Sequence, residues 1–172
     1  MQGPHTKRGR TSRLVWAAGL VAMLATSAFA QDYTATVTTD SNDAYESPAS
    51  NATTLTALSG QDDARTTVTI PFSFPYYGSA YTSISVCTNG FAQLGGGTAA
   101  NYSNLTLPQS GSLDGIICPL WDDLYLRSTG TVQTWTAGSA PNRRFIISWE
   151  AVPHISNSGS RHTFQIKLHE TS

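Results

Sequence analysis

Two adjacent carboxylates, Asp122 and Asp123, follow an apolar run that ends in Trp121. Paired acids of this kind could act as a general acid and base, as cation ligands, or as the polar end of a β-strand. Successive strand residues point to opposite faces, so the two side chains cannot share one cleft while the strand stays regular. A retaining glycosidase needs carboxyl groups about 5 to 5.5 Å apart across a bond. The pattern therefore favours a structural role, in which the aspartates bond backbone amides and begin a turn.

Calcium is the main competing interpretation of Asp122 and Asp123, since oxygen ligands from a turn suit Ca²⁺. The segment WDDLYLRSTG offers only these two acids and backbone carbonyls, and it has no D-x-D-x-D-G loop. We therefore expect no metal and no cofactor, with calcium at the two aspartates as the alternative.

Other candidates for chemistry are scattered along the chain. The sequence contains neither HExxH nor G-x-S-x-G, which are signatures of zinc and serine hydrolases. Glu150 could serve as an acid, although strand parity points it away from the neighbouring apolar face. Trp135 is the best candidate for an exposed aromatic that stacks on a sugar, because its parity neighbours are polar. We expect a protein that is not an enzyme; the alternative is a glycan-binding or glycan-active protein that uses Trp135 with Asp122, Asp123 and Glu150.

Short alternating segments must position these side chains. A period of two predicts strands with one buried face over 66–74, 145–149 and 164–168. Pro71 indicates an edge strand or a bulge, and Asn89-Gly90 predicts a two-residue hairpin turn. A weaker alternation over 33–39 (YTATVTT) predicts a further strand. Eight or nine short strands without a convincing helix predict an all-β fold, an antiparallel β-sandwich.

The first thirty residues have the features of a cleavable signal peptide. A basic start precedes an apolar run over 14–25, and Ala28 and Ala30 are the small residues of a cleavage site. The full chain has 10 basic and 11 acidic residues. Four of the basic ones lie in the first thirty residues, which leaves 6 against 11 and a net charge of −5. That charge argues against nucleic acid as a partner, and no other stretch predicts an integral membrane segment. We expect an exported protein, either extracellular, at the cell surface or periplasmic.

Three segments divide the chain. Residues 1–30 are the predicted signal peptide, 31–64 an N-terminal strand and polar loop, and 65–172 the β-sandwich. Because the sequence stops at Ser172, directly after a strong strand pattern, we expect that the sandwich could be incomplete at its C-terminus. Cys87 and Cys118 both lie in the exported part, where an oxidising compartment favours a Cys87–Cys118 disulfide over two buried free thiols.

Five motifs in this order resemble the nidogen-like extracellular β-domain of secreted bacterial proteins. They are PFSFPYYG, the TNG hairpin, PLWDDL, RRFIISW and TFQIKL, and they span roughly residues 65–170. The resemblance implies a non-catalytic module for binding, adhesion or assembly at the cell surface or in the matrix, with an unknown extracellular protein or glycan as partner. Two features depart from it: the cysteine pair, and the one or two further strands that members usually carry after TFQIKL.

Overall fold

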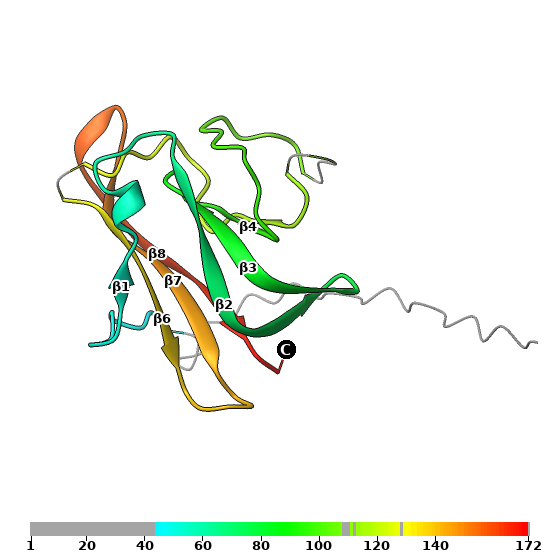
Figure 1. Ribbon diagram of the computed structural model, residues 1–172. Helices are drawn as coiled ribbons and strands as arrows, with labels where there is room; N and C mark the ends of the chain where they lie inside the picture. The colour runs from blue at the N-terminus through cyan, green and yellow to red at the C-terminus, as the bar shows by residue number, and fades with distance from the viewer. Residues whose placement is uncertain (1–43, 108–110, 112, 128, 172) are drawn as a thin grey trace, which may run out of the picture.

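The protein is described from a computed structural model, in which residues 44–107, 111, 113–127 and 129–171 are placed. The predicted signal peptide and the predicted strand over 33–39 lie outside these residues. The chain forms two four-stranded antiparallel sheets. Figure 1 shows that one sheet packs on the other. The only helical element of the described residues is a 3₁₀ turn, Thr56–Leu58. The predicted all-β antiparallel sandwich is therefore confirmed.

Each sheet contains one pair of long neighbouring strands. The first sheet has the order β1 (Thr53–Thr54), β6 (Thr131–Ala137), β7 (Arg144–His154) and β8 (Asn157–His169). The second sheet has the order β2 (Arg65–Tyr76), β3 (Ser79–Cys87), β4 (Ala92–Leu94) and β5 (Ile116–Ile117).

The strand β2 behaves as Pro71 predicted. It is an edge strand of its sheet, and its register with β3 shifts between Thr69 and Phe74. Tyr77 and Gly78 connect the two strands, and both have positive φ, of 45° and 77°. Two central residues with positive φ are what a type I′ hairpin turn requires. The tight two-residue turn of this domain is thus Tyr77-Gly78.

The hairpin predicted at Asn89-Gly90 exists, but its turn is longer than two residues. Cys87 N–H bonds the carbonyl of Phe91, and this bond encloses three residues of the connection between β3 and β4: Thr88, Asn89 and Gly90. Only Gly90 among these three has positive φ, at 72°. A Cβ there would lie 1.9 Å from the carbonyl oxygen of Leu120. This position therefore requires glycine for both backbone conformation and space.

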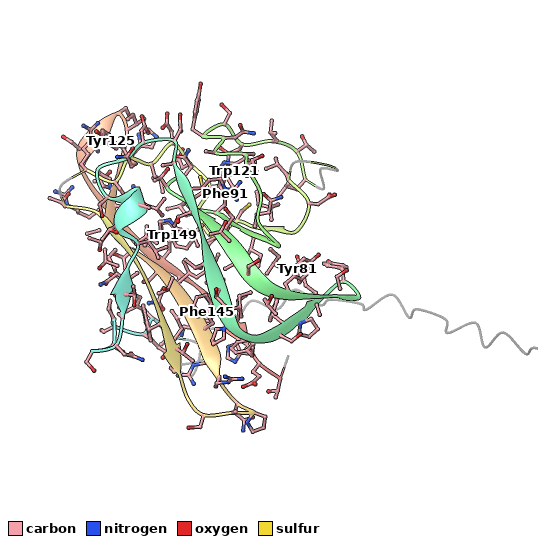
Figure 2. The ribbon with its side chains drawn as sticks, in the orientation of Figure 1. Tyr81, Phe91, Trp121, Tyr125, Phe145 and Trp149 are labelled. Atoms are coloured by element: carbon pink, nitrogen blue, oxygen red, sulfur yellow. The ribbon has the colours of Figure 1, made fainter. Side chains whose placement is uncertain are left out.

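The main core lies between the two sheets and takes the alternating residues that the sequence predicted. Trp149 is fully buried there; it stacks on Phe164 with ring centroids 5.1 Å apart. Its indole N–H donates to the carbonyl of Cys87 at 3.0 Å, which joins β7 to the end of β3 across the sandwich. Figure 2 shows Trp149 between the sheets and Phe145 farther along the same strand.

A second, smaller core lies on the other face of the second sheet. Cys87, Phe91, Leu113 and Trp121 are buried together there, beneath the long connection from β4 to β5. The rings of Phe91 and Trp121 are 5.3 Å apart, and Figure 2 shows both on the side of β3 away from Trp149. The loop thus acts as a third layer over one sheet.

The predicted Cys87–Cys118 disulfide is wrong for this structure, in which both cysteines are free. Cys87 ends β3, whereas Cys118 directly follows β5, and β4 lies between these two strands. Two strand spacings separate the cysteines by about 9.5 Å, beyond the roughly 7 Å that a disulfide can bridge. Both pack into the second core instead, as small apolar side chains do.

The prediction of an exposed Trp135 is also wrong. Its parity was read correctly, because it lies on the outer face of the first sheet, opposite Ile146 of β7. It is nevertheless only 4 % exposed. Residues 44–46 cross this face, where Glu46 forms ion pairs with Arg144 and Lys167 at 2.9 and 3.1 Å. A tryptophan that is only 4 % exposed does not present its ring to a sugar.

Candidate functional site

Three carboxylates meet where two distant segments come together. Asp62 and Asp63 precede β2, and Asp123 follows the second core at Trp121; one carboxylate oxygen from each lies within 4.8 Å of the others. Asp123 was a predicted candidate, whereas Asp62 and Asp63 were missed by the sequence analysis. The one feature of the sequence that could have indicated Asp62 and Asp63 is that they form a second pair of adjacent aspartates, sixty residues before Asp122 and Asp123.

Asn89 holds this acidic cluster in place. Its side-chain N–H₂ donates to Asp63 at 2.7 Å and to the carbonyl of Ala100 at 3.2 Å. Its side-chain oxygen accepts the backbone N–H of Leu124 at 3.0 Å. One fully buried amide therefore connects the turn before β2, the long β4–β5 loop and the segment that carries Asp123.

Mutual repulsion marks the electrostatics of the cluster. Burial and the charges of Asp63 and Asp123 raise the pKa of Asp62. Burial, followed by the charge of Asp63, likewise raises the pKa of Asp123. Carboxylate oxygens are the ligands that Ca²⁺ prefers, but it takes six to eight of them. Asp62, Asp63 and Asp123 are therefore the residues that could contribute to holding such a cation.

The two adjacent aspartates, which lie outside any named strand, have different bonding partners. Asp122 accepts the backbone N–H of Asp123 at 2.9 Å, a bond to a neighbouring backbone amide of the kind expected for it. It also lies 3.6 Å from Nε2 of His154. Only Asp123 of this pair belongs to the cluster of three.

His154 connects Asp122 to a serine in an arrangement that resembles a catalytic triad. The hydroxyl of Ser156 lies 2.8 Å from Nδ1 of His154, and the backbone N–H of Ser156 donates to the same nitrogen at 3.1 Å. Both contacts span only two residues within the exposed connection from β7 to β8. A side chain that bonds a backbone N–H two residues away is typical of turns, so this contact closes the hairpin.

Glu150 lies on the outer face of the first sheet, where it is bound by other side chains. The Tyr45 hydroxyl is 2.8 Å from both carboxylate oxygens, and the Ser148 hydroxyl also donates to one of them. Burial, together with the hydrogen bond to Glu150 and its charge, raises the pKa of Tyr45 to about 12. The structure therefore does not bring Glu150 together with Asp122 and Asp123.

Exposed apolar side chains lie at the tip of the β2–β3 hairpin and on the long β4–β5 loop. We call Tyr77, Tyr102, Leu105 and Leu107 the apolar patch; each is at least 42 % exposed. Tyr77, at the tip of the β2–β3 hairpin, lines a hollow of about 430 Å³ together with Leu107. Tyr102 and Leu105 line a second hollow of about 270 Å³ on the same loop. Surface apolar groups that cluster in this way commonly mark contact sites.

The comparison with known proteins decides the family. The sequence model of one family, described as NIDO related, matches residues 32–172. The chain belongs to the NIDO-related family. The match confirms the nidogen-like resemblance, and it begins well before the five motifs that suggested it. Neither a curated protein nor a solved structure matches the chain. In the described part of this NIDO-related domain, no helix is both long and apolar enough to cross a membrane.

Proposed function

We propose that this NIDO-related domain is an exported, non-catalytic module that binds or assembles with a protein partner at the cell surface or in the extracellular matrix. The observation that carries the proposal is the apolar patch on the hairpin tip and the long loop. Membership of a nidogen-like family supports an extracellular module of this kind. The divergence of the candidate acids further favours binding over catalysis.

The backbone at Tyr77 supports a role for its ring. A φ of 45° is easily adopted by asparagine or glycine and disfavoured for a bulky residue. The turn conformation therefore does not require tyrosine; its ring packs edge-on against Tyr76, with ring centroids 4.7 Å apart, and Tyr77 is still 64 % exposed. Tyrosine is enriched at the energetic centres of protein interfaces. Leu107, which lines the same hollow, favours a protein surface over a sugar, which stacks on flat aromatic rings.

The glycan alternative draws little support from the arrangement of its residues. Trp135 is covered, Glu150 is bound by Tyr45 on the outer face of the first sheet, and Asp122 and Asp123 point to different neighbours. A glycan-active site would need at least two of these groups to converge on one bond.

The proposal is tested by measuring saturation binding of the labelled mature chain, residues 31–172, to the surface fraction of the producing cells. A double variant, Tyr77→Asn with Leu107→Ser, removes two members of the patch and relieves the backbone strain at residue 77. We expect its binding to fall by at least about tenfold, as loss of an interface centre does, while its melting temperature is kept. Tyr45→Ser, an exposed tyrosine outside the patch, is the matched control and should bind as the wild type.

Three results would overturn the proposal: no saturable binding, equal binding by the double variant, or saturable binding that protease treatment of the surface fraction leaves intact. The last of these would indicate a glycan partner.

A further inference from the structure

The sandwich has an apolar groove along one side. β8 is at the edge of the first sheet and β5 at the edge of the second, and a groove of about 470 Å³ runs between them. Its walls include core side chains of both sheets: Phe74, Ile117, Ile166 and Leu168, with Pro119 beside them. Apolar side chains of this size gain free energy when they are covered.

The edge of β8 offers backbone groups to a further strand. Glu170 N–H bonds the carbonyl of Arg143, so this pair is hydrogen-bonded and alternate pairs along β7 and β8 are not. By that alternation, the backbone N–H and C=O of Gln165 and Lys167 face away from β7. Among the described residues, β8 pairs with no strand other than β7. An edge of thirteen residues with outward backbone groups is a ready template for strand addition.

The chain enters the described fold over the outer face of the first sheet, where it contacts side chains of β8. Lys167 Nζ donates to the carbonyl of Ala44, and Gln165 exchanges two hydrogen bonds with the backbone of Glu46. Residues 40–43 (DSND) are turn formers, and four residues span at most about 14 Å. The segment 33–39 therefore ends within reach of the edge of β8.

The segment itself has the residues that such a position needs. YTATVTT contains no charge, and Tyr33, Ala35 and Val37 alternate with threonines, a pattern of good strand formers. The family match begins at residue 32, which makes this segment part of the domain. We propose that residues 33–39 pair with β8 as a fifth strand of the first sheet and place Val37 and its parity neighbours in the groove.

Hydrogen exchange of the intact mature chain, residues 31–172, tests this strand directly. We expect amides within 33–39 to exchange at least about 100-fold more slowly than in a free peptide, as ladder amides do. Val37→Asp should remove that protection, speed exchange at Gln165 and Lys167, and lower the melting temperature by at least about 5 °C. Thr36→Asp, of opposite parity, is the matched control and should leave protection and melting near those of the wild type.

Three outcomes would overturn the proposal. Exchange of 33–39 at the rate of a free peptide would show that the segment is unpaired. Equal effects of Val37→Asp and Thr36→Asp would exclude the assigned parity. A dimer whose protection is lost on dilution would show that the strand comes from a second copy.

Discussion

Replacing Asn89 with alanine removes the amide that connects three segments. Its loss leaves the backbone N–H of Leu124, a fully buried residue, without an acceptor, which costs about 1 to 3 kcal/mol. The bond to the carbonyl of Ala100 contributes about 1 kcal/mol. The bond to Asp63 adds little more, because that carboxylate is exposed to water. We expect Asn89→Ala to lower the free energy of unfolding by about 3 kcal/mol.

For a domain of this length, about 3 kcal/mol corresponds to a fall in melting temperature of about 10 °C. Circular dichroism melts and urea unfolding of the mature chain measure both quantities. Asn157→Ala is the matched control: its side chain accepts only the N–H of Gly159 in an exposed hairpin, so a loss of no more than about 0.5 kcal/mol is expected. If Asn89→Ala were as mild as that control, Asn89 would not organise the acidic cluster.

Three further predictions concern thiols, carboxylates and pH. The unfolded, unreduced protein should show two free thiols, and a mass two daltons below that of the reduced protein would instead show a disulfide. In the native protein, Cys118 should resist alkylation at pH 7, because burial raises its pKa to about 11. Asp62→Asn should raise the melting temperature at pH 7 in the presence of chelator, because it relieves carboxylate repulsion; a lower melting temperature would contradict the electrostatics. Calcium should leave the melting temperature of the wild type unchanged. If calcium instead raised that temperature, and did not raise it in Asp62→Asn, the result would favour a calcium site. The hydrogen bond with Arg144 lowers the pKa of Glu46 below 4.5. The stabilisation that Glu46 contributes at higher pH should therefore disappear as pH falls through its folded-state pKa. In urea unfolding, Glu46→Gln should lower the free energy of unfolding at pH 7 but hardly at pH 2, and an equal loss at both would refute the ion pair.

The sequence predicted side-chain burial best in strands of which only one face packs against a core. The alternation over 66–74 and 164–168 identified the buried face correctly, because parity alone decides which side chains point inward. Over 145–149 it identified the side chains of the main core, but the prediction of one buried face is wrong there, since Ile146 and Ser148 on the outer face are also fully buried. It failed at Trp135, whose parity was right but which is only 4 % exposed on the outer face. Burial of an outer sheet face is a tertiary property that periodicity does not contain.

The acidic cluster and the cysteines show the same limit. Asp62 and Asp123 come together only because Asn89 bonds two loops, and nothing in their local sequence predicts this contact. The disulfide was inferred from compartment chemistry, but strand order places β4 between the two cysteines. Turn chemistry was only partly readable: Tyr77-Gly78 forms the tight turn, although Asn89-Gly90 has the commoner signature.

Photocrosslinking from residue 77 tests the central claim, contact through the apolar patch, most directly. A benzophenone amino acid replaces Tyr77, residues 31–172 are bound to the surface of the producing cells, and the sample is irradiated. The reference carries the same probe at Ser158, an exposed residue of β8. We predict one covalent adduct with a protein, formed from position 77 and not from position 158. Equal labelling from both positions, or no adduct from position 77 under saturating binding, would contradict the account.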